Sequence, residues 1–386
     1  MTVAGVNLTA IGLFSLMSLP YSLKFLWSPV IDRFSLPFLG RRKGWLFVTQ
    51  IALAVAIAGM SFGEPSHALK FVAVIAFAIA FLSATQDITI DAYTTDISDA
   101  SEVGAASGTK VLGYRIAMIA TGAGALVLAD LLSWQTVYFL LGVIMLILAV
   151  VSTRLPEPVL RDRPPMSMNE AIRMPLVDFF ERMGKGRAIS ILVFILLYRL
   201  GDSMINSMTT PFLIQTGFSQ TDVGVVQGGV GLFATIVGVL AGGAVIARIG
   251  INRSLWVFGV LQAASNFAYM LLAYAGRQYQ VMVGAIIIEN LCYGLATAAL
   301  VGFIMSLCNP RFSATQYALL SSLIAVGRDV VAAPSGSLAQ MMGWPLFFLV
   351  SVIAAIPGMT LLPLFAPWRR QSIGNLVENA PVDAQF

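Results

Sequence analysis

The sequence predicts an all-α membrane protein made of two related helical bundles, and three observations support this fold class. Hydrophobic residues make up 58% of the 386 residues, charged residues make up 11%, and the mean hydropathy is +0.84. Soluble domains carry about 25% charged residues, so this exterior suits lipid rather than water. The apolar residues form continuous blocks long enough for helices, whereas barrels show alternating strands of about ten residues. The two halves of the chain also resemble each other.

Eleven apolar blocks predict eleven membrane spans, because each has about the twenty residues that cross a bilayer core. The blocks lie near 8–30, 45–63, 70–95, 102–129, 135–153, 188–213, 222–246, 255–275, 280–307, 312–338 and 344–366. A polar segment rich in proline and charge separates the fifth block from the sixth. We therefore predict an N-terminal bundle of five spans (1–153), a cytoplasmic linker (154–187), a C-terminal bundle of six spans (188–370) and a cytoplasmic tail (371–386).

Lysine and arginine fix the predicted orientation, since cytoplasmic loops carry an excess of both. Residues 41–43, the linker and the pair Arg369-Arg370 all fall on one side of the predicted membrane. The other side has little beyond Lys70 and Arg277. The C-terminus is therefore expected inside the cell, and the amino terminus of an eleven-span chain outside. No signal-peptide pattern precedes the first block.

The internal repeat has an offset of about 212 residues. Residues 8–12 resemble 220–224, and Gly-Tyr-Arg at 113–115 resembles Val-Gly-Arg at 326–328. Two six-helix halves related in this way are the organisation of major facilitator transporters. The block 188–213 has no counterpart in the first half. The repeat therefore predicts one more helix before the first block, either upstream of this sequence or lost from a shortened relative.

The connection between the first two spans holds the first candidate motif. Asp32 and Arg33, followed by Arg41 and Arg42, resemble the major facilitator signature G-x-x-x-D-R-x-G-R-R, with serine for the leading glycine and an insertion. Such a carboxylate can join two bundles on the cytoplasmic side through charge-assisted hydrogen bonds. A plain positive-inside anchor is the alternative. Together with the repeat, the motif favours a cytoplasmic gate, to which Asp91 near the same membrane side is added.

Ionisable residues inside spans are costly and therefore point to function. Gln86, Asp87 and Asp91 share a helical face of the third block, and Arg115 on the next span is the expected partner of Asp87. The alternatives are a proton site, a substrate contact or a structural ion pair.

Two later spans carry further polar residues. Arg199 and Asp202, spaced to pair with each other, accompany Tyr198 and Asn206. Glu289 has no basic residue near it in sequence, which makes it the leading candidate for proton coupling.

Other chemistry finds little support in the sequence. Cys292 and Cys308 fall in one apolar stretch and indicate no disulfide framework, and the single histidine, His67, cannot form a metal site. The net charge of +4 lies at helix ends, which gives no basis for nucleic-acid binding. A membrane-embedded transferase needs an acid–base or nucleophile constellation on a wet loop, and the external connections are too short. We expect no catalytic residue, no metal and no cofactor.

Several strings resemble the AmpG muropeptide permease family. They include IGLFSL at 11–16, KFLWSP at 24–29, SATQDI at 83–88, LYRLGD at 197–202 and FSATQYAL at 312–319. The resemblance spans nearly the whole chain. It implies a major facilitator fold that imports N-acetylglucosaminyl-1,6-anhydro-N-acetylmuramyl peptides from periplasm to cytoplasm. It also implies proton coupling and roles in peptidoglycan recycling and β-lactamase induction. The sequence differs from the family in lacking the first helix and the extra C-terminal spans of some members.

The resemblance implies specific roles for the polar residues inside the spans. Counted with the missing helix, the spans that carry Asp87, Asp202 and Glu289 are the fourth, seventh and tenth, which line the central cavity of major facilitator transporters. Substrate contacts are expected from Gln86, Arg115, Tyr198, Arg199, Asn206, Asn290 and Arg328, and proton coupling from Asp87, Asp202 and Glu289. The expected partners are a muropeptide, protons and lipids, for a monomer in the bacterial inner membrane. The alternatives are another major facilitator carrier, such as one for drug efflux or acetyl-CoA import, and a non-transporting sensor.

Overall fold

The computed structural model describes residues 19–368, except 37–38, 64–68, 100 and 160–162, and these residues are mainly helical. Nine helical segments among them are long and apolar enough to cross a membrane. The predicted all-α membrane fold is thereby confirmed. The predicted block 8–30 is only partly described, and the block 312–338 forms helix α16 (Ser313–Met342), which is not among the nine. The total of eleven spans stays a prediction.

The chain forms two compact units. Unit 1 contains residues 1–97, 116–176 and 308–322, and unit 2 contains 98–115, 177–307 and 323–386. The N-terminal part of α6 thus belongs to unit 2, and the first turns of α16 belong to unit 1. The predicted linker 154–187 contains a helix, α9, whose residues are divided between the units.

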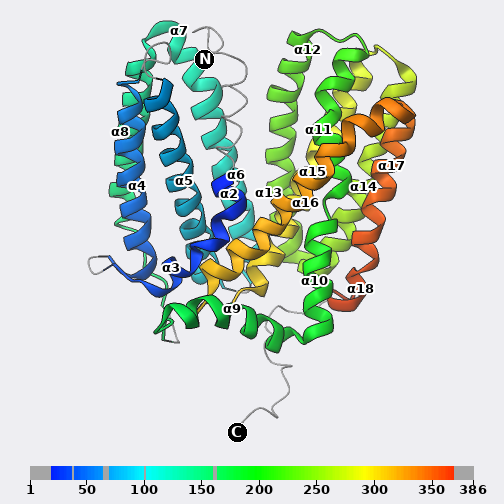
Figure 1. Ribbon diagram of the computed structural model, residues 1–386. Coiled ribbons are helices and arrows are strands. Elements are labelled where there is room, and N and C mark those ends of the chain that lie inside the picture. Colours follow the sequence, from blue (N-terminus) through cyan, green and yellow to red (C-terminus); the bar gives the residue numbers. More distant parts are fainter. Residues whose placement is uncertain (1–18, 37–38, 64–68, 100, 160–162, 369–386) are drawn as a thin grey trace. The chain divides into compact units, whose positions relative to one another are not determined.

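Unit 1 is centred on three long helices that run side by side (Figure 1): α4 packs against both α5 and α8. Gly142 on α8 allows this approach, because a Cβ there would lie 3.0 Å from the Ala54 carbonyl oxygen. The helical elements that lie at least partly in unit 1 are α2 (Leu19–Leu23), η3 (Lys24–Leu26), α3 (Ser28–Arg33), α4 (Arg41–Met60), α5 (Leu69–Ile97), α6 (Val103–Ile119), η4 (Ala120–Gly124), α7 (Ala125–Leu131), α8 (Trp134–Ser152), α9 (Met168–Met183) and α16.

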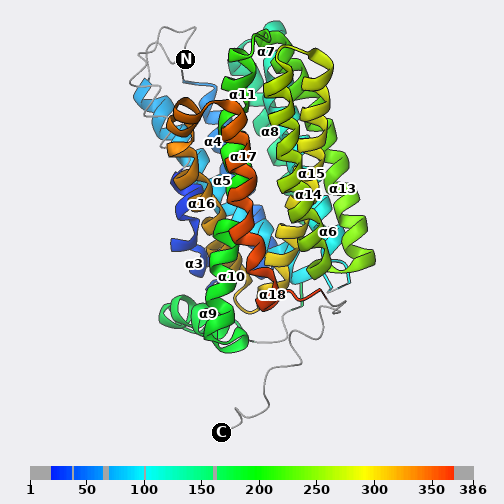
Figure 2. The same cartoon turned by 90° about the vertical axis from the view of Figure 1, so that its right-hand side faces the viewer.

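Unit 2 is centred on α15, which packs against α13 and α14 (Figure 2). Its remaining helical elements, besides its parts of α6, α9 and α16, are α10 (Lys185–Leu197), α11 (Leu200–Gln215), α12 (Gln220–Val225), η5 (Val226–Gly231), α13 (Leu232–Ile249), α14 (Ile251–Ala275), α15 (Tyr279–Leu307), α17 (Trp344–Thr360) and α18 (Leu362–Phe365). An aromatic cluster of Phe212, Tyr269, Trp344 and Phe348 joins α11, α14 and α17. This cluster anchors one end of the helices that carry the polar residues described below.

One predicted span is broken at the point where its polar residues lie. Residues 185–215 are long enough to cross a membrane, but α10 ends at Leu197 and α11 begins at Leu200. The Tyr198 hydroxyl donates to the Leu255 carbonyl oxygen at 3.0 Å, and Gly259 and Gly358 leave room for Tyr198. Broken helices at membrane depth expose backbone groups and commonly line binding sites in transporters. The break places Arg199 and Asp202 at the start of α11.

Candidate functional site

The first polar cluster in unit 1 surrounds the buried carboxylate of Asp32. Arg41 and Arg42 each donate to Asp32 Oδ1 at 2.9 Å. The backbone N–H groups of Ala314 and Thr315, at the start of α16, donate to its two oxygens at 3.2 and 2.7 Å. Asp32 therefore caps a helix of the second half of the chain while pairing with two arginines of the first half. We call these five residues the Asp32 cluster.

Further contacts tie the Asp32 cluster to its surroundings. Arg42, which is 1% exposed, also donates to Asp96 Oδ2 at 2.7 Å and to the Ser313 hydroxyl at 2.7 Å. Arg41 donates to the carbonyl oxygens of Pro310 and Arg311. Every donor here is a charged guanidinium group, so the start of α4 and the segment around the start of α16 are held together by strong hydrogen bonds. The sequence motif thus marks a real junction within unit 1.

Two residues predicted for the gate lie apart from the Asp32 cluster. The Arg33 guanidinium lies 5.0 Å from the centre of the Phe34 ring. Asp91 is 2% exposed and pairs with Lys24.

The second cluster of unit 1 is built around Lys24, a residue that sequence reasoning did not single out. Its ammonium group donates to Asp87 Oδ2 at 2.6 Å and to Asp91 Oδ2 at 3.3 Å. Lys24 lies on η3 and the two carboxylates lie one turn apart on α5. The sequence pointed to Arg115 as the partner of Asp87, but the structure pairs Asp87 with Lys24. We call these three residues the Lys24 cluster.

Neighbouring contacts hold η3 against α5. The Trp27 indole donates to the Thr85 hydroxyl at 3.1 Å, and its ring lies 4.8 Å from that of Phe81. Gln86, predicted to bind substrate, has a buried Oε1 with no hydrogen-bond partner among the described residues. An unpaired buried acceptor is costly, so this oxygen is available to a donor on a ligand or water.

The third cluster lies in unit 2 and centres on Arg199. This residue donates to Asp202 Oδ2 at 3.3 Å and to the Thr297 hydroxyl at 3.0 Å. Its guanidinium carbon lies 4.2 Å from the centre of the Tyr293 ring, and that of Arg115 lies 5.7 Å from the same ring. Two cations thus contact one aromatic ring, a favourable arrangement for arginine. The predicted Arg199–Asp202 pair is present.

Glu289 lies in the same neighbourhood, where it interacts electrostatically with Asp202, Arg199 and Arg115. It is 4% exposed, and Asn290 Nδ2 donates to its Oε2 at 3.0 Å. Its Oε1 is buried and has no hydrogen-bond partner among the described residues. Glu289 therefore differs from Asp87 and Asp202, each of which has a basic residue within 3.3 Å. We call Arg115, Arg199, Asp202, Glu289, Asn290, Tyr293 and Thr297 the Arg199 cluster.

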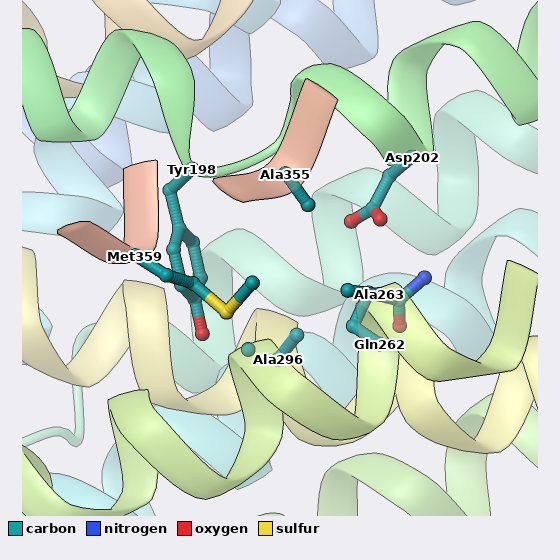
Figure 3. Close-up of a pocket in the computed structure, with 8 residues that line it drawn as sticks. Tyr198, Asp202, Gln262, Ala263, Ala296, Ala355 and Met359 are labelled. Carbon is teal, nitrogen blue, oxygen red and sulfur yellow. The ribbon is translucent and has the colours of Figure 1, made fainter. Parts of the chain in front are cut away.

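A small pocket adjoins Asp202 on the side of α14 and α17 (Figure 3). Its empty volume is at most about 250 Å³, including space open to solvent, and it is lined by Tyr198, Asp202, Gly259, Gln262, Ala263, Ala296, Ala355 and Met359. Ligand pockets usually have about 300–1,000 Å³, so this one is too small for a sugar–peptide conjugate. Both polar atoms of Gln262 are buried without a partner among the described residues, which makes the pocket a suitable place for water.

The other predicted contact residues occupy more varied positions. Tyr198 is buried, and its hydroxyl is engaged by Leu255. Asn206 is exposed and donates to the Asp202 carbonyl oxygen, while the Asn290 Oδ1 accepts from Thr235 at 3.0 Å. Arg328 is exposed on α16. Among the described residues, no group of three histidine, cysteine or acidic side chains is placed to hold a metal ion.

Sequence signals existed for the residues that were missed. Lys24 is a lysine inside a predicted span, the same kind of signal that singled out Asp87. Tyr293 and Thr297 follow Glu289 at intervals of four residues, so one face of α15 carries all three. Gln262 gave no such signal, because an amide in a span is common and its burial depends on tertiary packing.

Comparison with known proteins places this arrangement among transporters. The model of the Major Facilitator Superfamily matches residues 1–332. The chain is 47% identical over 364 residues to the anhydromuropeptide permease of Escherichia coli (strain K12), covering 94% of this chain and 74% of that protein. It is 35% identical over 369 residues to the putative transporter AmpG 4 of Rickettsia felis, covering 93% and 88%.

Solved structures agree on the fold. The human organic anion transporter MFSD10 (TETRAN) superimposes with a TM-score of 0.69 at 15% identity, covering 94% of this chain and 87% of that one. The proton:xylose symporter XylE gives a TM-score of 0.69 at 10% identity, covering 93% and 86%. Identities this low carry information about the fold alone.

Proposed function

The chain belongs to the AmpG branch of the major facilitator superfamily, and from this membership we propose that it is a secondary transporter of anhydromuropeptides. The observation that carries the proposal is the 47% identity to an anhydromuropeptide permease over 94% of the chain. Such a protein is a multi-pass membrane carrier of a small molecule and not an enzyme. The proposed direction is import from periplasm to cytoplasm across the bacterial inner membrane, by a monomer with a cytoplasmic C-terminus.

The proposed substrate contacts are polar side chains of the clusters described above. A muropeptide presents sugar hydroxyls and peptide carboxylates. Arginine binds carboxylates through paired N–H groups, which suits Arg115 and Arg199. Gln86 offers an unpaired buried oxygen to a hydroxyl donor, and exposed Asn206 offers an amide. Tyr198 supports the site through its bond to Leu255 instead of through a direct contact.

Proton coupling is proposed at the buried carboxylates, with Glu289 first. A transporter driven by protons needs an acid that takes up a proton on one side and releases it on the other. Glu289 Oε1 can accept a proton without an ion pair being broken, whereas Asp202 is engaged by Arg199. The two remain within electrostatic reach of each other, so a change of charge on one is felt by the other.

The Asp32 cluster is proposed to act as the cytoplasmic gate. Its hydrogen bonds join α3 both to the start of α4 and to the N-terminus of α16, so opening requires that they break together. Buried ion pairs are poor sources of net stability but strong determinants of one conformation. This property suits a gate that must be either closed or open.

The proposed substrate is tested by replacing the Escherichia coli permease with this chain. Bacteria that lack their own anhydromuropeptide permease should regain cytoplasmic anhydromuropeptides, measured by mass spectrometry of cell extracts, when they express it. Expression should be verified in membranes by immunoblotting. If the protein reaches the membrane and cytoplasmic anhydromuropeptides stay at the level of the deletion strain, a different substrate or a sensor role replaces the proposal.

A further inference from the structure

The three side chains of the Lys24 cluster differ in how exposed they are. Lys24 and Asp91 have side chains that are 6% and 2% exposed, but the side chain of Asp87 is 39% exposed. Asp87 also makes the shorter of the two contacts with Lys24, at 2.6 Å against 3.3 Å. Of the two carboxylates that contact Lys24, Asp87 is therefore the one that is open to the surroundings.

A carboxylate approaching Lys24 from the accessible side would have to take the place of Asp87. Both aspartates accept hydrogen bonds from the ammonium group. The approaching group would carry the same charge and the same acceptor atoms as Asp87. Two carboxylates close together repel, and this repulsion is relieved when one of them binds a proton.

We propose that Lys24 binds a carboxylate of the transported solute in exchange for Asp87, and that Asp87 takes up a proton as the exchange occurs. This inference rests on the proposed function and adds to it a specific residue and a coupling step. The observation behind it is the arrangement of one buried cation between a buried carboxylate and an exposed one.

The exchange conserves charge. Before binding, the cluster holds one ammonium group and two carboxylates, a net charge of −1. After binding, Asp87 is a neutral acid, Asp91 and the solute carboxylate are ionised, and Lys24 is still an ammonium group, so the net charge is again −1. The hydrogen bond from Lys24 to Asp87 breaks and one from Lys24 to the solute forms. Since no net charge enters a poorly hydrated region, the step avoids the large cost of burying an unpaired ion.

Several other ionisable groups on the elements that pack against α5 have contacts of their own, and Tyr21, the ionisable residue of α2, is exposed. On α4, Arg41 and Arg42 contact Asp32, and Arg42 also contacts Asp96, further along α5. Lys43 Nζ donates to the Thr153 carbonyl oxygen, and Arg33 on α3 lies over the Phe34 ring. Among the contacts described here, Asp87 pairs with Lys24, and Lys24 also pairs with Asp91.

Binding by purified protein tests the inference. Isothermal titration with an anhydromuropeptide, in buffers of different ionisation enthalpy, measures the protons taken up per solute bound. The wild-type chain should take up about one more proton than Asp87→Asn, and its affinity should fall by up to about tenfold per pH unit as pH rises. Asp87→Asn should bind with an affinity that depends much less on pH. Asp99→Asn, at an exposed position between α5 and α6, is the matched control, and it should keep the extra proton.

A second comparison uses the solute instead of the acid. The wild-type chain should bind the anhydromuropeptide at least roughly tenfold more tightly than the same compound with its peptide carboxylates converted to amides. Lys24→Met should lose this preference, and Lys70→Met, at an exposed position of α5, should retain it. Because Lys24→Met leaves Asp91 buried without its cation, Lys24→Arg is measured beside it and should keep the preference.

The outcomes separate the inference from the proposed function. If the wild-type chain binds no anhydromuropeptide, the proposed function fails and the inference fails with it. If the wild-type chain binds but Asp87→Asn takes up as many protons, the exchange is overturned while the function stands. A Lys24→Met protein that folds, binds and still prefers the carboxylate form would overturn it as well.

Discussion

Glu289 is the residue on which the proposed proton coupling most depends. It is buried, one of its oxygens accepts from Asn290, and the other has no partner among the described residues. Replacing it with glutamine keeps the shape and removes the ability to carry a proton. The substitution therefore separates proton coupling from binding better than a truncation would.

Glu289→Gln should abolish the acceleration of uptake by an inward proton gradient. A coupling free energy of about 1–3 kcal/mol makes such an acceleration roughly 5- to 150-fold. Exchange of labelled for unlabelled substrate across liposomes should persist, because exchange requires no net proton movement. Both rates are measured with the same protein preparation.

The matched control for this prediction is Glu102→Gln, at an exposed position before α6. It should leave both rates unchanged. Gradient-driven uptake at the wild-type rate in Glu289→Gln would exclude Glu289 as the coupling acid and leave Asp87 and Asp202 as the candidates.

At the scale of single residues, the sequence predicted ion pairs within one helix better than ion pairs between distant elements. The spacing of Arg199 and Asp202 predicted their pairing correctly, because residues three apart on a helix are neighbours. The partner of Asp87 was not predictable in this way, since it comes from η3, 63 residues away in sequence. Pairs between distant elements depend on packing that a single sequence does not reveal.

At the scale of elements, the N-terminus of α16 is the clearest case of one segment completing another. Its first turn has no acidic residue of its own. The backbone N–H groups that a helix leaves unpaired at its start are satisfied by Asp32, a residue almost 300 positions earlier. A negative charge at this end is also favoured by the helix dipole.

Asp32→Asn should destabilise unit 1 by about 3 kcal/mol, since it removes a buried charge that two arginines and two backbone groups share. The expected result is a lower melting temperature in detergent and faster hydrogen exchange at the amides of Ala314 and Thr315. Asp178→Asn is the control, because Asp178 and Arg182 form a more exposed pair one turn apart, worth about 0.3–0.5 kcal/mol. Equal effects of the two substitutions would contradict the capping role of Asp32.

The helices themselves were largely predictable, and their interruptions were not. Long apolar blocks require helices in lipid, so nine of the predicted spans correspond to nine described segments. At the break between α10 and α11, Tyr198 packs against Gly259 and Gly358, two contacts with distant elements that the local sequence does not reveal. The helix α9 lay inside a segment whose prolines and charges indicated only a linker.

At the scale of the whole molecule, repeat, composition and motif led to the same superfamily that the comparisons found. The repeat did not reveal that each compact unit includes a segment from the other half of the chain. Gly104 and Gly243 show the physical reason for one of these, since a Cβ on Gly104 would lie 2.8 Å from the Gly243 carbonyl oxygen. Small residues allow this close approach of α6 to α13 within unit 2.

The central proposal is that the chain carries an anhydromuropeptide across a membrane by proton-coupled transport. It is tested most directly in sealed liposomes that contain the purified protein and a pH-sensitive dye, with the outside made acidic. Addition of labelled anhydromuropeptide outside should raise its internal concentration above the external one and acidify the interior, and dissipating the gradient should end the accumulation. Saturable binding with no internal accumulation, or accumulation that ignores the gradient, would contradict the account.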